Sequence, residues 1–585
     1  MRILNKYKTY ILITILAILI GLYFSYPFTN GILHMGADTG FHLTRIQSYR
    51  DAILKGVKYP YMWWNANFNF GYPTPLYYCQ LLLFPAVWLI ARGISLIKAY
   101  KIYIVCLMIT STFFVGLCQM KVSKAKVSTI ILTMFIYLIN PHQVTSIFRR
   151  SALGETMGLV FIPLALLGIY YVLYDDQNKW YVLTLGFLGL VLSHNITFIL
   201  MCILFFFFIL LNIKELLKNK QRLLSILKAI IATVLLSLFF ILPMLEGLSN
   251  NAMWINSPNN TTPIEAITLD KLFNFSCGWE VYQCSSPGPF LLFLPLCGLF
   301  IKNKNENNKF IYHCFIMSFV FLFMMTTYFP WKLFSFMNFM QFTSRILPIL
   351  ILLEAISGSY YFMELSNKIS NKYLRYLPLT ILLIVFMVVS FSWLKTNYSG
   401  MYGYSDDDTL ESAYERLYKP NEDNTYYDAQ ALSSADYNHE MYLDYIHYEY
   451  TTVDNSLSHS IIDTSEEMEI DDGLINREEY YHYSFVINKN NHENATVIAP
   501  RTYYYGYKVN VIKDGEIIDT LDTTMSKDGL VKFEALKSDT PITYDVYYQI
   551  SSIQKYSMII SKVSTMLVPI YVIYDCFIKN KLRKQ

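Results

Sequence analysis

The chain has 585 residues, of which 54% are hydrophobic and only 16% charged, and its mean hydropathy is +0.31. Soluble globular proteins carry about 25% charged residues, so this composition excludes an ordinary soluble enzyme and indicates a multi-pass membrane protein. The net charge of +3 hides a segregation, because residues 401–550 hold 30 acids and 10 bases while the rest hold 14 acids and 37 bases. Basic loops stay on the cytoplasmic side and an acidic domain can be exported, so the basic excess indicates topology and not nucleic-acid binding.

The N-terminal segment starts with basic residues, continues into an apolar run of about 18 residues and lacks a small-x-small cleavage site, so we expect a retained first span at 9–27. A polar, aromatic and turn-rich loop at 28–99 follows. A helix that begins at Asp38 would carry one continuous stripe on its surface. The members of this stripe are Asp38, His42, Arg45 and Tyr49. Because Trp and Tyr favour the membrane–water interface and crowd residues 61–78, we predict that this helix lies at the level of the lipid headgroups.

Apolar runs of sufficient length predict about 12 transmembrane helices. They lie near 9–27, 100–119, 127–141, 156–174, 180–195, 197–213, 228–247, 289–302, 310–329, 346–363, 375–394 and 556–577. The run 76–92 is interpreted as a re-entrant or interfacial helix, because a span there would place Lys121, Lys124 and Lys126 outside. With this choice both termini are cytoplasmic and the basic connections are inside.

The predicted organisation is a transmembrane domain at 1–395, an extracytoplasmic domain at 396–550, and a last helix with a basic cytoplasmic tail at 551–585. Residues 400–475 are acidic and Tyr-rich with weak periodicity, whereas the second half of the domain alternates as antiparallel strands do. Lys513-Asp514-Gly515 is typical of a tight hairpin. We therefore expect a β-sandwich-like domain. Cys277 and Cys284 share one loop, where a disulfide and two free thiols are equally open.

Several polar side chains converge on the predicted outer face. They are Asp38, His42, Arg45, Arg149, Arg150, Glu155, His194, Asn195, Glu246, Gln341 and Arg345. Charged groups at membrane depth are costly and usually face a cavity or a partner, so this clustering indicates a site. Arginine forks suit a phosphate or pyrophosphate, and a nearby carboxylate can accept a proton from an acceptor hydroxyl.

Each of these side chains also has a structural interpretation. Asp38 could be only the N-cap of its helix, and His42 could be only an interfacial anchor, as Tyr49 could. Arg149 and Arg150 could bind lipid headgroups, although we expect one of them to face inward. Glu155 would complement the dipole of a helix that starts beside it.

The same residues carry a resemblance to a known group. The motif G-x-D-x-x-x-H at Gly36–His42, together with GYPTPLYY, RRSALGE, LSHN and QFTSR, resembles the motifs of YfhO-like bacterial membrane proteins. These are also catalogued as "6-pyruvoyl-tetrahydropterin synthase-related membrane protein" and are similar to the GT-C class of glycosyltransferases. The resemblance covers most of the chain, including APRTYYYGYKVNVIKDGE, and implies that Asp38 is the essential first-loop acid of the class. Thr343-Ser344 stands where Pro-Trp is expected before Arg345, which changes the expected shape of that loop. No His cluster supports the soluble zinc chemistry that the pterin-synthase label implies.

These observations lead to a hypothesis of a membrane glycosyltransferase that takes a sugar from a polyprenyl-phosphate donor and transfers it to an envelope polymer or lipid at the outer face. Asp38 and His42 would be catalytic, and Arg45, Arg149, Arg150, Glu155, His194, Gln341 and Arg345 would bind substrate. A divalent metal is possible, held in part by Asp38. Two alternatives stay open. A lipid or polymer transporter would need a polar path to the cytoplasm, with Glu354 as its deep charge, and an envelope assembly protein would not depend on the Asp38 cluster.

Overall fold

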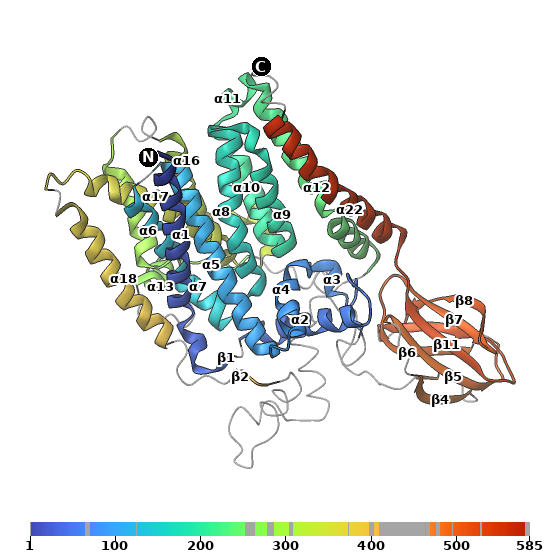
Figure 1. Ribbon diagram of the computed structural model, residues 1–585. Helices are drawn as coiled ribbons and strands as arrows, with labels where there is room; N and C mark the ends of the chain where they lie inside the picture. Colours follow the sequence, from blue (N-terminus) through green and yellow to red (C-terminus); the bar gives the residue numbers. More distant parts are fainter. Residues whose placement is uncertain are drawn as a thin grey trace, which may run out of the picture.

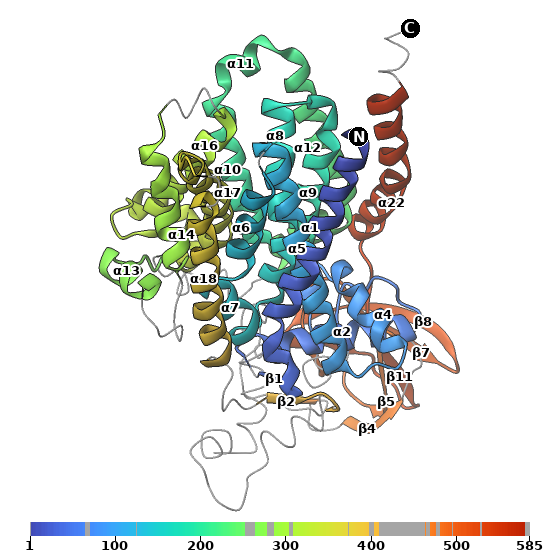
Figure 2. The ribbon, with the colours of Figure 1, turned by 60° about the vertical axis from the view of Figure 1, so that its left-hand side comes forward.

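The computed structural model of the chain describes residues 2–34, 36–64, 71–124, 126–251, 264–277, 286–302, 308–371, 374–396, 403–408, 462–463, 468–475, 480–493, 495–526 and 529–578. It is a bundle of long helices with a β-domain at one end, as the sequence predicts (Figure 1). The start of α1 (Arg2–Phe24) and the last turns of α22 (Ser552–Ile573) lie at the same end of the bundle. The β-domain and the first loop lie at the opposite end (Figures 1 and 2).

Each of the twelve predicted spans contains helical residues, but not every one is a helix long enough to cross a membrane. The remaining helices of the bundle and its connections are α5 (Leu96–Ser123), α6 (Val127–Leu138), α7 (Pro141–Val144), α8 (Leu153–Tyr174), α9 (Trp180–Ser193), α10 (Asn195–Leu211), α11 (Ile213–Lys218), α12 (Lys220–Asn250), α13 (Leu269–Cys277), α14 (Pro289–Phe293), α16 (Lys309–Met325), α17 (Leu347–Ser366) and α18 (Leu377–Thr396). Among the described residues, seven helices are long and apolar enough to cross a membrane, or eight if the bent pair Val127–Leu138 and Pro141–Arg149 is one span. The number twelve is therefore not confirmed: α9 has 14 residues, which cover about 21 Å of a hydrocarbon core about 30 Å thick.

The first loop does not cross the bundle. Its run 76–92 is divided into α3 (Thr74–Tyr77), a 3₁₀ turn at Leu81–Leu83 and α4 (Phe84–Ala91). The longest of these has eight residues, which cover about 12 Å, so the prediction that 76–92 is not a span is confirmed.

The predicted helix at the head of this loop is α2 (Thr39–Leu54), with Asp38 at its N-cap position. The Asp38 side chain makes no capping hydrogen bond, so capping does not account for this residue. His42 and Tyr49 are each only 2% exposed. They are packed inside the protein, and their interpretation as interfacial anchors is wrong.

The β-domain is built from two antiparallel sheets, in strand orders β3-β6-β10-β9 and β4-β5-β11-β7-β8. The strands are β3 (Ile462–Asp463), β4 (Met468–Ile475), β5 (His482–Asn490), β6 (Ala495–Thr502), β7 (Tyr507–Lys513), β8 (Glu516–Asp522), β9 (Thr524–Met525), β10 (Leu530–Ala535) and β11 (Ile542–Tyr548). Phe485, Val509 and Phe533 belong to one buried core of the domain, so the β-sandwich prediction is confirmed. Asp514 and Gly515 both have positive φ in the turn between β7 and β8, as the hairpin prediction requires. Residues 409–461 and Cys284 lie outside the described residues.

A short segment of the first loop holds the β-domain. The hydroxyl of Tyr481 accepts the Tyr61 N–H at 2.8 Å, and the hydroxyl of Tyr480 accepts the Trp64 N–H at 3.1 Å. Arg501 donates to the Trp64 carbonyl at 2.8 Å and stacks on its ring at 4.3 Å. Because these atoms are buried, each bond satisfies a group that water cannot reach. The β-domain is therefore fixed to the same loop that carries α2 and α3.

Substitution Tyr481→Phe removes the acceptor of a buried backbone N–H while keeping the ring. We expect a cost of about 1–3 kcal/mol, because the donor is left without a partner. A lower midpoint of thermal unfolding of the full-length protein in detergent would report it. Tyr556→Phe, at a tyrosine that is 61% exposed on α22, is the control. Equal midpoints for the two variants would contradict this account of the docking.

Candidate functional site

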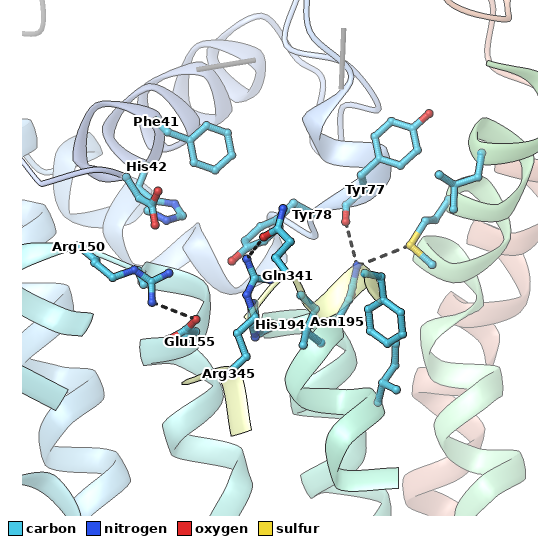
Figure 3. Close-up of a pocket in the computed structure, with 17 residues that line it drawn as sticks. Phe41, His42, Tyr77, Tyr78, Arg150, Glu155, His194, Asn195, Gln341 and Arg345 are labelled. Carbon is cyan, nitrogen blue, oxygen red and sulfur yellow. Dashed lines mark hydrogen bonds and ion pairs between the residues drawn. The ribbon is translucent and has the colours of Figure 1, made fainter. Parts of the chain in front are cut away.

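A cavity of about 410 Å³ lies between the first loop and the neighbouring ends of α8, α10 and α12 (Figure 3). Most of the predicted site residues line it. They are Asp38, His42, Arg150, Glu155, His194, Gln341 and Arg345. The chain thus brings into one pocket side chains that are separated by as many as about three hundred residues in sequence. The remaining two predicted residues, Arg45 and Arg149, are not part of its lining.

The pocket is assembled by a close backbone contact between two motifs. The Asp38 N–H donates to the Arg150 carbonyl at 2.9 Å. A Cβ atom on Gly36 would lie 2.0 Å from the Arg149 carbonyl oxygen, so only glycine fits here. The Thr39 hydroxyl donates to that of Ser151 at 2.7 Å. The glycine of G-x-D thus lets the start of α2 rest on the turn that precedes α8.

Two guanidinium groups share one wall of the cavity. Arg150 forms an ion pair with Glu155 at 3.6 Å, and Arg345 donates to the neutral Gln341 side chain at 2.7 Å. Both guanidinium groups lie over the Phe342 ring, at 5.6 Å for Arg150 and 4.7 Å for Arg345. In the described part of the chain no carboxylate lies within ion-pair distance of Arg345, and its buried Nε has no hydrogen-bond partner. This arrangement can hold an anion with two cationic forks.

Glu155 is already engaged within this wall. Besides its ion pair with Arg150, its Oε2 accepts the Ser146 hydroxyl at 3.0 Å. It lies in the first turn of α8, where a carboxylate also complements the helix dipole. These partners indicate that Glu155 holds Arg150 in place, and Asp38 is the other carboxylate of the lining.

His42 lies between two hydrogen-bond donors. The Arg45 guanidinium faces its Nδ1 at 3.2 Å and the Leu153 N–H faces its Nε2 at 3.3 Å. Burial, with Arg45 and then His194 nearby, holds the pKa of His42 well below its usual range, so the ring is neutral at pH 7. A neutral imidazole has one acceptor nitrogen, which these donors already compete for. The ring therefore positions the start of α8 and is poorly placed to transfer a proton.

The arginines Arg45 and Arg149 have other surroundings. Arg45 is 1% exposed, donates to the carbonyls of Tyr78 and Cys79, and lies over the Tyr78 ring at 4.1 Å. It ties α2 to the loop after α3 and does not reach the cavity. Arg149 contributes its backbone to the contact with Gly36, while its neighbour Arg150 faces inward. One of the two arginines thus faces the cavity, as the sequence predicts.

Sequence reasoning missed Tyr77 and Tyr78 as lining residues, and it placed Asn195 on the predicted outer face without giving it a role in the site. Burial raises the pKa of Tyr78 to about 12, with Arg45 lowering it and Asp38 and Glu155 raising it, so its hydroxyl stays protonated beside these charges. The Asn195 amide donates to the Tyr77 carbonyl at 3.0 Å and so joins α10 to α3 (Figure 3). The two tyrosines belong to the GYPTPLYY motif, which could have pointed to them. From aromatic composition alone, this segment is interpreted as an aromatic belt at the membrane interface.

Another part of the cavity wall is apolar. It is formed by Ile196, Ile199, Met244, Leu248 and Phe339. Ile199 is 37% exposed and Leu248 36% exposed, so this wall continues onto the outer surface of the bundle. A ligand with a charged head and a long apolar chain would match the two walls.

Two other predicted groups lie elsewhere. Glu246 lines a second cavity beside the β-domain. Glu354 is 2% exposed within α17, and its Oε2 has no hydrogen-bond partner among the described residues. Within the same residues, no group of three or more His, Cys, Asp or Glu side chains is arranged to hold a metal ion. A divalent ion at this pocket would thus need ligands from its substrate as well as Asp38.

No family model matches the chain. An uncharacterized protein of Lactococcus lactis subsp. cremoris (strain MG1363) is 24% identical over 618 aligned positions, covering 99% of this chain and 97% of its own length. Among solved structures, the arabinofuranosyltransferase AftD from Mycobacteria aligns with 66% of this chain at a TM-score of 0.46 and 13% identity. The aligned region is 27% of the length of AftD. At these values the likeness carries no argument about activity, which has to come from the pocket.

The wall formed by Tyr78 can be tested at Gly154, where a Cβ atom would lie 1.5 Å from the Tyr78 hydroxyl oxygen and 2.6 Å from Cζ. Gly154→Ala should lower the unfolding midpoint, because Tyr78 has to leave its place. Adding Tyr78→Phe removes the nearest atom and should restore part of the loss. Gly158→Ala is the matched control, because Gly158 lies on the same helix and its Cβ atom would have no neighbour closer than 3.8 Å. A double variant as unstable as the sum of its single variants would contradict the contact.

Proposed function

We propose that this chain is a membrane glycosyltransferase of the GT-C type, which transfers a sugar from a polyprenyl-phosphate-linked donor to a cell-envelope acceptor. The observation that carries the proposal is the two-sided pocket. Arg150 and Arg345 form a cationic wall, Ile199 and Leu248 form an apolar wall that opens to the surface, and Asp38 lies in the same lining. A lipid-linked phosphate sugar has the matching parts, namely an anionic head and a long hydrocarbon chain.

In the proposed reaction, a hydroxyl oxygen of the acceptor attacks the anomeric carbon of the donor sugar. The bond from this carbon to the phosphate oxygen breaks, and its electron pair leaves with the polyprenyl phosphate. Asp38 accepts the proton of the attacking hydroxyl as general base. Because Glu155 is held by Arg150 and Ser146, we assign this step to Asp38 alone, and a single catalytic carboxylate favours a single displacement with inversion at the anomeric carbon.

Arg345 and Arg150 would stabilise the negative charge that grows on the leaving phosphate. Arg345 suits this role because it donates to the neutral amide of Gln341, so its charge is not neutralised by that partner. Such groups are effective when they are fixed before the reaction and shielded from water. The stacking of both guanidinium groups on Phe342 would provide that fixation.

The proposed orientation puts this pocket and the β-domain at the outer face of the cytoplasmic membrane. The support is the charge distribution: the connections between spans are basic, whereas residues 401–550 are strongly acidic. Both ends of the described chain lie at the end of the bundle away from the pocket, as two cytoplasmic termini require. A divalent ion bound by Asp38 and the donor phosphate would add to the charge stabilisation, although the steps above do not depend on it.

Asp38→Asn should lower the rate of sugar transfer by about 10²–10⁴-fold, because an amide cannot accept the hydroxyl proton. The donor lipid should accumulate in a deletion strain that carries this variant, and mass spectrometry of lipid-linked sugars would detect it. Asp51→Asn is the matched control, since Asp51 lies on the same helix and pairs with Arg50 at the surface. Both variants should insert and melt as the parent does. Undiminished transfer by Asp38→Asn would remove Asp38 from the mechanism.

Arg345→Gln should reduce transfer by about 10²–10³-fold, the usual effect of removing one group that stabilises charge in the transition state. Inhibition by inorganic pyrophosphate should weaken in the same variant, because both effects depend on one anion site. Arg92→Gln is a suitable control, since Arg92 is exposed and lies on the Trp88 ring outside the cavity. Loss of activity with unchanged pyrophosphate inhibition would place the phosphate elsewhere.

A further inference from the structure

A second cavity, of about 570 Å³, lies where the β-domain meets α12 and α22. Its walls come from the turn before β7, the end of β8, the connection from β11 to α22, and α12. The charged, amide and aromatic side chains of its lining that the argument uses are Glu246, Tyr503, Tyr505, Lys508, Asp522 and Gln549. None of these contributes to the first cavity, and the function proposed above does not use them.

Hydrogen bonds between the walls fix the shape of this cleft. The Tyr505 N–H donates to the Asn251 side-chain oxygen at 2.8 Å, which joins the turn to the end of α12. The Gln549 N–H donates to the Gly506 carbonyl at 2.8 Å, and the Ser551 hydroxyl donates to Glu246 at 2.7 Å. Ser551 also begins α22 with a capping box. The cleft is therefore formed before any ligand enters, and such preorganisation lowers the entropic cost of binding.

The chemistry of the lining suits a polyol. Tyr505 is 47% exposed, so a large part of its surface is open to a ligand, and Tyr503 lies beside it half-buried. Tyrosine rings offer apolar area at low conformational cost together with a hydroxyl. The carboxylates of Glu246 and Asp522 accept hydrogen bonds, while the Gln549 amide both donates and accepts them. Sugars present such hydroxyl groups around an apolar ring face.

The charges argue against an anionic ligand. Within the lining, Lys508 is the basic side chain and it is paired with Asp522. Glu246 remains as a further negative charge, so a phosphate would be repelled where a neutral hydroxyl would be bound.

We propose that this cleft binds a neutral glycan and, building on the function proposed above, that the glycan is the acceptor polymer. Its place relative to the reaction pocket supports this role. Met244 and Leu248 of α12 line the first cavity, and Glu246 lines the second. Residues two positions apart on a helix point to opposite sides, so the two cavities are separated by about one helix diameter, roughly 10 Å. The cleft and the pocket that Asp38 lines are thus on the two sides of one helix.

The test is saturation-transfer NMR on the full-length protein in nanodiscs, with two probes. These are neutral oligosaccharides released from the envelope of the host cell, and inorganic phosphate as the anionic counter-probe. We expect the oligosaccharides to receive saturation and the phosphate not to compete. Tyr505→Ala should weaken oligosaccharide binding by roughly tenfold, since it removes the stacking surface. Asp522→Asn should weaken binding less, because Asp522 also neutralises Lys508.

Two control variants lie outside the cleft. Tyr328→Ala removes a tyrosine that is 69% exposed, and Asp519→Asn changes an exposed carboxylate on the same strand as Asp522. Both should bind as the parent does. The proposal is overturned if no oligosaccharide binds, if phosphate displaces it, or if Tyr505→Ala binds like the controls.

The same measurement separates this inference from the proposed function. Asp38→Asn should keep full oligosaccharide binding while it loses transfer. Binding that depends on Tyr505 together with undiminished transfer by Asp38→Asn would leave the glycan cleft standing and the mechanism refuted. If Asp38→Asn loses transfer but Tyr505→Ala binds the oligosaccharide as the parent does, the glycan cleft is refuted and the mechanism stands.

Discussion

The contact between Gly36 and the Arg149 carbonyl is the constraint on which the pocket lined by Asp38, Arg150 and Arg345 depends. A side chain at position 36 would lie 2.0 Å from that oxygen, and the neighbouring Asp38 N–H is bound to the Arg150 carbonyl. Backbone contacts of this kind place a helix more firmly than contacts between long side chains, because few rotatable bonds lie between the two elements. They fix the start of α2 against the start of α8, and they bring Asp38 close to Arg150 and Glu155 although more than one hundred residues separate them.

The β-domain adds a second constraint on the same loop. Its tyrosines hold the backbone of residues 61–64, and α3 follows shortly after in the chain. Tyr77 and Tyr78, which line the pocket, thus lie between a segment held by the β-domain and a segment held by Arg45. Trp63 and Tyr72 exchange backbone hydrogen bonds at 2.8 and 3.0 Å, so a displacement of the β-domain would be passed to the segment that carries Tyr77 and Tyr78. These hydrogen bonds join the β-domain to the helix bundle in this region.

Hydropathy and periodicity predicted much of this fold, including α2, the hairpin at Asp514–Gly515 and the exclusion of 76–92 as a span. Hydropathy and periodicity gave no correct prediction where the backbone departs from regular helix geometry. Which of Arg149 and Arg150 faces inward depends on a π-helical turn at Thr145–Arg149, followed by Ser151 with φ of +57°, and a period of 3.6 residues does not describe either. The sequence correctly predicted that Asp38, His42 and Arg45 follow one another along α2. Only Asp38 and His42 line the pocket, however, whereas Arg45 is packed against the loop and donates to backbone carbonyl groups. Span number could not be read from apolar runs, because several of them fold into helices too short to cross unaided.

Helix α12 lies between the two cavities and contributes side chains to both of them. Neither the sequence nor one cavity alone indicates this arrangement. One side of its last turns gives Met244 and Leu248 to the reaction pocket, and the other side gives Glu246 to the cleft beside the β-domain. Pro243 precedes these residues within the helix and removes one backbone hydrogen bond there. The end of α12 is held instead by Asn251, whose side chain binds the Tyr505 N–H of the β-domain. An acceptor in the cleft would therefore bind to the helix that also contributes to the apolar wall of the pocket, so that, in the proposed function, recognition of the polymer and placement of the donor share one helix.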